Sequence, residues 1–246
     1  MRYEEFTIEG RNAVLEAFRA GKTIDKLFVQ DGCHDGSVLS ITREARKVNA
    51  IIQYVDKERL DAMSKTGKHQ GVIAYAAAYS YAEVEDILAA AREKGEDPFI
   101  FILDNIEDPH NLGAIIRTAN LAGAHGVIIP KRRAVGLTAT VARTSAGALN
   151  YTPVAKVTNI AATIDELKKE GLWFVCADMD GEIMYRQNLK GPIGLVIGNE
   201  GEGVGRLIKE KCDFTASIPM KGNIDSLNAS FVKQMPAYEI VRQRMM

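Results

Sequence analysis

The chain has 246 residues, of which 46% are hydrophobic and 26% charged, and its formal net charge is −1. This length and composition predict one or two folded domains with a sizeable core, and they argue against a disordered chain. The near-neutral charge excludes a uniformly basic nucleic-acid binder, so any such surface has to come from local clusters of lysine and arginine.

The cysteines and the N-terminus indicate the cellular compartment. Cys33, Cys176 and Cys212 are scattered and form no CxxC pair, which indicates free thiols in a reducing environment and no structural zinc. The N-terminal sequence lacks the apolar region of a signal peptide, and no run approaches the roughly 18 apolar residues of a membrane span. We therefore expect a soluble cytoplasmic protein without a metal site and without a membrane partner.

Residues 1–78 predict a small α/β unit. Helices are expected over 12–20 and 38–48, and strands over 26–30, 51–55 and 72–76. The polar loop 65–71 carries Lys65, Lys68 and His69, a composition that suits phosphate contact but is shared by solvated turns. An alanine-rich helix within residues 79–98 is expected to link this unit to a second domain, residues 99–246.

From Phe99 onward, short apolar strands alternate with helices. This alternation predicts a parallel sheet covered on both faces, whose ligands bind beyond the carboxyl ends of the strands. The expected strands are 99–103, 126–129, 152–157, 173–177, 194–197 and 214–218, and the expected helices are 112–122, 138–148, 160–169, 204–211 and one after 227.

The loop after strand 99–103 leads into a helix that carries an arginine. Asn111 is predicted to be the N-cap of this helix. Arg117 is flanked by Ile115, Ile116 and Ala119, so we expect a mostly buried guanidinium, which requires an anionic partner. The partner is either a substrate phosphate or a structural acid such as Asp104 or Glu200.

A glycine-rich stretch, GLVIGNEGEGVG, occupies residues 194–205. A short apolar run ends at Gly198, Asn199 and Glu200, and three alternating glycines follow. Bare main chain of this kind lets a ligand lie against the backbone, although a plain βα turn has the same composition. The spacing matches neither GxGxxG nor GxxxxGK[ST], which argues against an ordinary dinucleotide fold and against a P-loop NTPase.

Polar and basic residues cluster after other strands as well. The loop after strand 214–218 offers Ser226, Asn228 and Ser230 beside an expected helix start. Small residues around Ser145 suit close packing against a backbone or a ligand. Four basic residues are predicted to form a track for phosphate groups: Lys131, Arg132, Arg133 and Arg143. The alternative interpretation is a solvated, charged face.

Three of these stretches resemble, in order, the motifs of the SpoU (TrmH-type) RNA ribose 2′-O-methyltransferases. They are NLGAIIRTA at 111–119, GNEGEGVG at 198–205 and IPMKGNIDSLNAS at 218–230. The segment IEGRNAV at 8–14 resembles the substrate-binding domain of the ribosomal members. The resemblance covers the whole chain and is highly specific because all three motifs occur in order.

The resemblance implies an α/β fold: a trefoil-knotted SPOUT parallel-sheet domain preceded by a small α/β substrate-binding domain. It further implies a homodimer that uses S-adenosylmethionine to methylate the ribose of a guanosine in large-subunit (23S) ribosomal RNA. Two alternatives remain open. One is a tRNA methyltransferase of the same family, and the other is a non-catalytic RNA- or ribosome-binding homologue.

Carried over position by position, the resemblance implies two sets of site residues. The catalytic set is Arg117, Asn111, Glu200 and Asn228. The cofactor-binding set is Gly198, Ile218, Leu227, Met220, Asn199 and Ser145. The sequence departs from the family pattern after Ser230, where Pro236 predicts a last helix that is kinked or begins late.

Overall fold

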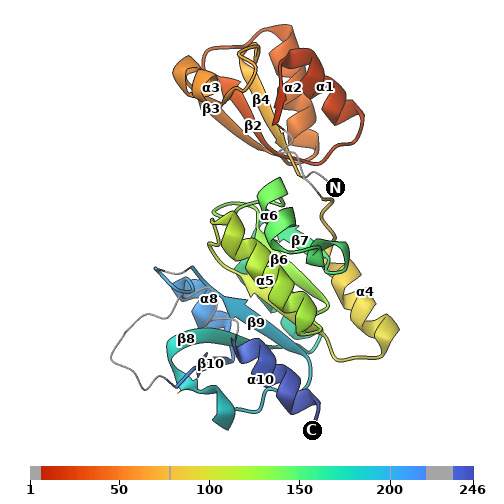
Figure 1. Ribbon diagram of the computed structural model, residues 1–246, viewed down its shortest axis with the longest axis vertical. Helices are drawn as coiled ribbons and strands as arrows, with labels where there is room; N and C mark the ends of the chain where they lie inside the picture. Colours follow the sequence, from red (N-terminus) through yellow and green to blue (C-terminus); the bar gives the residue numbers. More distant parts are fainter. Residues whose placement is uncertain (1–6, 78, 200, 220–234) are drawn as a thin grey trace. The chain divides into compact units, whose positions relative to one another are not determined.

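The computed structural model describes residues 7–77, 79–199, 201–219 and 235–246 (Figure 1). Its contacts divide the chain into two compact units. The first contains the residues up to Ser80 together with Gly136–Thr140, and the second contains Tyr81–Val135 and Val141–Met246. Each unit has its own sheet and its own hydrophobic core.

The first unit is a four-stranded mixed sheet with helices on both faces. The strand order is β1-β4-β2-β3, with β2 and β3 parallel and the other pairs antiparallel. The elements are β1 (Thr7–Glu9), α1 (Arg11–Arg19), β2 (Ile24–Gln30), α2 (Gly36–Lys47), β3 (Ile51–Val55), α3 (Lys57–Met63) and β4 (Val72–Ala76).

Alternation along the strands of this unit assigns each residue to one face. Leu27 and Val29 of β2 pack in one buried cluster with residues of α1 and α2. Phe28, between them, packs against Leu60 of α3 on the other face. Both β1 and α3 are absent from the sequence prediction, because β1 has only three residues and α3 buries only Leu60.

The loop 65–71 is held in place by its own unit, and His69 is not a surface cation. His69 is 5% exposed, its Nδ1 accepts from the Gly71 N–H at 3.0 Å, and its Nε2 lies 2.8 Å from Asp61 Oδ1. A backbone donor at Nδ1 leaves the proton on Nε2, so both nitrogens of a neutral ring are used. Of the three residues expected to suit phosphate contact, His69 is therefore buried and hydrogen-bonded within its own unit.

Glu9 anchors the start of the same loop. Its carboxylate accepts hydrogen bonds from the hydroxyls of Ser64 and Thr66 and from the Lys65 N–H, at 2.5 to 2.7 Å. Partial burial raises the pKa of Glu9, but these hydrogen bonds lower it more, to about 2 from an ordinary 4.5. The charged carboxylate thus stabilises the loop at neutral pH.

We expect Glu9→Gln to lower the free energy of unfolding at pH 6. Between pH 4.5 and 2, the free energy of unfolding of the variant should fall less steeply than that of the wild type. A depressed folded-state pKa contributes stability above pH 4.5, and this contribution is lost as the pH falls through about 2. Urea unfolding followed by circular dichroism at several pH values measures both effects. Glu166→Gln, at an exposed position of a helix in the other unit, is the control; equal pH profiles for the two variants would contradict the assignment.

The second unit contains a six-stranded, wholly parallel sheet in the order β10-β8-β9-β5-β6-β7. Its strands are β5 (Phe99–Leu103), β6 (Gly126–Pro130), β7 (Val154–Val157), β8 (Trp173–Ile183), β9 (Ile193–Ile197) and β10 (Phe214–Ser217). Its helices are α4 (Val84–Lys94), α5 (Pro109–Leu121), α7 (Ile160–Lys169), α8 (Arg206–Lys211) and α10 (Met235–Arg244), with 3-10 turns η1 (Ala148–Asn150) and η2 (Met184–Arg186). Helix α6 (Ala139–Thr144) crosses the division, since its residues from Val141 onward belong to this unit.

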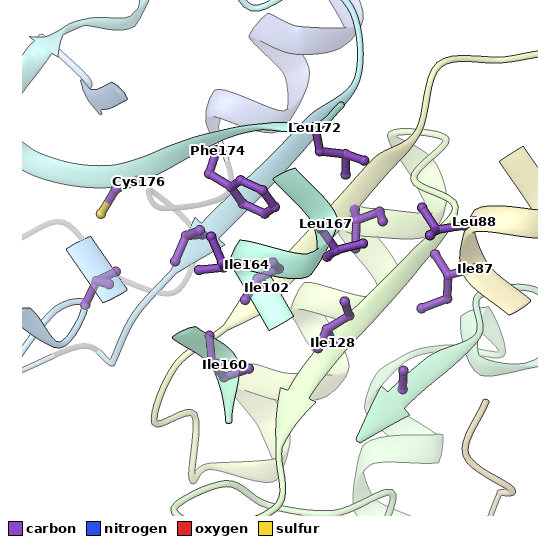
Figure 2. Close-up of a cluster of buried hydrophobic side chains, with 14 residues drawn as sticks. Ile87, Leu88, Ile102, Ile128, Ile160, Ile164, Leu167, Leu172, Phe174 and Cys176 are labelled. Atoms are coloured by element: carbon purple, nitrogen blue, oxygen red, sulfur yellow. The ribbon is translucent and has the colours of Figure 1, made fainter. Parts of the chain in front are cut away.

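Helices cover both faces of this sheet. Figure 2 shows Ile87 and Leu88 of α4 with Ile164 and Leu167 of α7 around the β5 residue Ile102, in one buried cluster. The other face carries α5, which contacts β6, and α10, whose Arg244 lies 5.2 Å above the Phe99 ring (Figure 1). The segment expected to be a linker therefore contributes a helix to the core of the second unit.

One strand of this sheet is much longer than the prediction. β8 continues six residues beyond the expected end at Ala177, and its pairing with β10 shifts register between Thr215 and Ala216. An added Cβ at Gly181 would come 2.4 Å from the Thr215 carbonyl oxygen, so glycine permits this close pairing. The last helix, α10, is described over Met235–Arg244 and contains Pro236, but the segment before Met235, on which the expected kink or late start depends, lies outside the described residues.

Candidate active site

The loops after β5 and β9 meet at the carboxyl edge of the sheet. β5 and β9 are neighbours, but the chain continues from β5 toward β6 and from β9 toward β10, on opposite sides. Such a switch in direction opens a crevice where parallel sheets bind ligands. Three hydrogen bonds join the loops: Asp104 N–H to Ile197 O at 2.9 Å, Asn199 Nδ2 to Asn105 O at 3.0 Å, and Gly205 N–H to Asp104 Oδ2 at 2.8 Å.

The glycine-rich loop folds tightly back on itself. Gly203 has φ of +72° and donates its N–H to Asn199 O at 3.1 Å. An added Cβ at Gly198 would lie 2.1 Å from the Gly203 carbonyl oxygen, so the loop's own backbone fills that space. An added Cβ at Gly201 or Gly203 would meet no described atom nearer than 3.7 Å. Among the described residues, these two positions therefore have more room beside the main chain than Gly198 has.

The start of α5 is set by Asp108 and Pro109, not by Asn111. The Asp108 carboxylate accepts from the His110 N–H at 2.6 Å and the Asn111 N–H at 3.4 Å, and Pro109 occupies the first turn. Asn111 is a half-buried residue of the first turn. The predicted N-cap was therefore wrong by three residues, although the Asp-Pro pair signalled the correct position.

Arg117 is exposed, contrary to the expected burial. The buried residues of α5 include Leu112, Ile115, Ile116 and Ala119, which recur at helical spacing and face the core. Arg117 follows Ile116 by 100° around the helix and points away from the sheet. Within the part of the chain that the structure describes, it forms no ion pair, so the proposed structural pairing with Asp104 is absent.

Ser145 has a packing role in this structure. It is 0% exposed, and its hydroxyl donates to Ala142 O at 2.9 Å. Just before it, Thr144 lies so close to α5 that an added Cβ at Gly113 would come 1.9 Å from its Oγ1. The small residues here allow the end of α6 to contact α5 closely. The structure thus shows close packing against a backbone, and the expected contact of Ser145 with the cofactor stays a prediction.

The remaining predicted site residues divide into two groups. Gly198 and Ile218 lie just beyond β9 and β10, which flank β8 on its two sides. The others fall outside the described residues: Glu200, Met220, Leu227 and Asn228. No trio of His, Cys, Asp or Glu among the described residues is placed to hold a metal ion.

Asp178 of β8 is a charged neighbour of the glycine-rich loop that sequence reasoning missed. Its Oδ2 accepts from Lys209 Nζ at 2.9 Å. Partial burial raises the pKa of Asp178, but the hydrogen bond and positive charge of Lys209, together with backbone hydrogen bonds, lower it more, to a value below its ordinary 3.8. Its position directly after the expected strand 173–177 was the signal that could have found it.

Comparison with known proteins identifies the family. The profile of the SpoU rRNA Methylase family matches residues 98–236, and that of the RNA 2'-O ribose methyltransferase substrate binding domain matches residues 7–82. The chain belongs to the SpoU methylase family. It is thus a methyltransferase of the SpoU (TrmH) type, with the expected substrate-binding domain in front of the parallel-sheet domain.

Relatives of known name agree with this assignment. The chain is 50% identical over 237 residues to "Putative TrmH family tRNA/rRNA methyltransferase YacO" of Bacillus subtilis, covering 96% of this chain and 94% of that protein. It is 46% identical over 242 residues to a protein of the same family name from Staphylococcus saprophyticus, covering 98% and 97%.

Solved structures of SpoU-type proteins share the architecture. The SpoU methyltransferase AviRb of Streptomyces viridochromogenes, solved in complex with the cofactor AdoMet, aligns with a TM-score of 0.61 at 25% identity, over 98% of this chain and 91% of that one. The TrmH/SpoU tRNA modifying enzyme of A. aeolicus aligns with a TM-score of 0.54 at 28% identity, over 61% and 77%. Among the described residues, no helix has the length and apolar character needed to cross a membrane.

Proposed function

We propose that this SpoU-family enzyme transfers the methyl group of S-adenosylmethionine to the ribose 2′-hydroxyl of a guanosine in 23S ribosomal RNA, and that it acts as a homodimer in the cytoplasm. The observation that carries the proposal is the meeting of two family motifs at one edge: NLGAIIRTA on α5 and GNEGEGVG after β9. The RNA-binding role falls to the first unit, which carries the substrate-binding domain match.

The described part of the edge fits the methyl donor. Gly201 and Gly203 leave the main chain of the turn bare, and bare main chain lets a ligand lie against the backbone. We assign donor binding to this loop through Gly198 and Asn199, and to Ile218 after β10. The chemistry supplied by the bound donor is an electrophilic methyl group on a sulfonium. Leu227 and Met220, which lie outside the described residues, complete the proposed set.

Arg117 is proposed to hold the RNA. Its guanidinium stays protonated in proteins, so it is a poor base but a strong partner for a phosphate. Exposed on α5 and without an ion pair among the described residues, it can clamp the phosphate of the target nucleotide and stabilise charge that develops on the 2′-oxygen. Such positioning contributes several kcal/mol to rate enhancement. A phosphate oxygen or a water then takes the proton.

Asn111 is proposed to support this arrangement. It lies half-buried in the first turn of α5, beside the loop whose Asn105 carbonyl is bound by Asn199. Glu200 and Asn228 are proposed to orient Arg117 and the ribose, by their positions in the motifs. Asn111, Glu200 and Asn228 are thus proposed to position other groups, and none of the three accepts the proton of the 2′-hydroxyl.

A tRNA substrate is the second candidate, because the similar enzyme from A. aeolicus is described as tRNA modifying. Incubation of the full-length protein with tritium-labelled S-adenosylmethionine and unmodified 23S rRNA or bulk tRNA separates the two. We expect label in 23S rRNA, at a guanosine 2′-oxygen that mass spectrometry finds unmethylated in cells lacking the protein. Label confined to tRNA would support the second candidate, and no transfer to either would indicate a non-catalytic homologue.

A further inference from the structure

Three cationic side chains gather at the carboxyl edge of β6 and β7. Lys131 directly follows β6, and its N–H donates to Val157 O at 2.7 Å. Lys156 lies on β7, with its Cα opposite that of Ile129. Arg132, the third, is exposed and follows Lys131. The backbone pairing thus places all three at one end of two neighbouring strands.

Lys156 is held in a fixed position by Tyr81. Its Nζ lies 3.3 Å from the Tyr81 hydroxyl oxygen, to which it donates, and 4.7 Å from the centroid of the ring. The backbone next to Tyr81 is fixed in turn, because the Ala82 N–H donates to Val154 O at 2.9 Å. A lysine side chain usually loses much rotamer entropy when it binds a ligand. In Lys156, the contact with Tyr81 already restricts the side chain in the folded protein, so less rotamer entropy is lost when a ligand binds.

The positive charges of Lys131, Arg132 and Lys156 repel one another. Burial lowers the pKa of Lys131, and the positive charges of Lys156 and Arg132 lower it further. Neither Lys131 nor Arg132 has a carboxylate partner within the described part of the chain. Other lysines of the same unit do have one, in the pairs Lys168–Asp213, Lys209–Asp178 and Lys211–Asp165. Lys131 and Arg132 are thus crowded positive groups that meet no acid among the described residues, which is what an anion site requires.

We propose that Lys131, Arg132 and Lys156 form a phosphate-binding site for the RNA backbone, with Tyr81 as the residue that positions Lys156. This inference rests on the proposed function and adds a contact outside the methylated nucleotide. β7 lies two strands from β5, about 10 Å at the usual strand spacing. The loop after β6 is tied to the loop after β5 by the Val135 N–H and Ile106 O, 3.0 Å apart. A phosphate bound here therefore belongs to a flanking nucleotide.

The test measures how RNA affinity depends on salt. Each lysine that contacts a phosphate contributes about one unit to the slope of log K against log salt concentration. We expect Lys131→Gln and Lys156→Gln each to weaken binding of unmodified 23S rRNA and to lower the slope by about one, and the double variant by about two. Lys169→Gln, at an exposed position on α7, is the matched control and is expected to leave the slope unchanged.

Two further readouts distinguish a lost phosphate contact from damage to the fold or to the donor site. The melting temperature of Lys131→Gln should equal or exceed that of the wild type, because repulsion is relieved, and S-adenosylmethionine affinity measured by calorimetry should not change. An unchanged slope in the double variant, or a wild-type protein that binds no RNA, would overturn the site. If the wild type binds RNA with the expected salt dependence but transfers no methyl group, only the proposed function fails.

Discussion

Replacement of Arg117 by alanine should lower the rate of RNA methylation by about 100-fold or more while leaving S-adenosylmethionine affinity within twofold of the wild type. Loss of one donor that stabilises developing charge typically costs a factor of about 100 to 1,000 in turnover. Arg117 is exposed on the outer face of α5, so its removal leaves no cavity in the core. The free energy of unfolding should change by no more than about 0.5 kcal/mol, as is usual for surface positions.

Arg117→Lys sharpens this test. Lysine keeps the charge but loses the planar fork that binds a phosphate through two hydrogen bonds, so we expect activity between those of the wild type and the alanine variant. Arg186→Ala removes an exposed arginine elsewhere in the same unit and serves as the matched control. Single-turnover methylation at saturating donor concentration is the measurement. Activity of Arg117→Ala within tenfold of the wild type would reject the assignment.

The strands of the second unit were the part of the fold most accessible from the sequence. Fully buried parallel strands appear as short apolar runs, and the bounds of β5 were predicted without error. β8 was predicted too short because its second half, from Asp178 onward, is polar and largely exposed. Elements that bury few residues leave little pattern, which is also why α3 was missed, with Leu60 as its one buried side chain.

The two errors on α5 have a common physical origin. Apolar neighbours in the sequence suggested that Arg117 is buried, yet adjacent helical residues point 100° apart, so Ile116 faces the core while Arg117 faces outward. The choice of Asn111 as N-cap overlooked Asp108, whose carboxylate reaches the first N–H groups, and Pro109, which needs no N–H there. Periodicity and capping applied residue by residue would have corrected both.

The candidate site was predictable as a set of loops but not as a set of contacts. The rule that ligands bind at the carboxyl ends of strands brought the loops after β5 and β9 together correctly. Nothing in the sequence indicated that β8 separates β9 from β10, because strand order depends on long-range pairing. Likewise, the contact between Lys156 and Tyr81 joins residues 75 positions apart and leaves no local signal.

The second large effect is expected at Gly198, where any side chain meets main chain. An added Cβ would lie 2.1 Å from the Gly203 carbonyl oxygen and 2.3 Å from the Val204 nitrogen, and contacts below 3.0 Å force a shift. The neighbours are backbone atoms, so no side-chain rotation can relieve the clash. Overpacking of this kind costs about 1–3 kcal/mol. Gly198→Ala should therefore lower the melting temperature by several degrees and weaken donor binding at least tenfold.

Two other glycines make this result interpretable. Gly36→Ala places a methyl group where nothing lies within 4 Å, in the first turn of α2, so it should not lower the melting temperature and should leave donor binding unchanged. Gly201→Ala, with 3.7 Å to its nearest neighbour, should keep the melting temperature but lower donor affinity severalfold, because its methyl group covers main chain that the proposed donor site leaves bare. Thermal melts and calorimetry with S-adenosylmethionine give both readouts. If Gly198→Ala matched the wild type in both, the tight turn after β9 would not be what shapes the donor site.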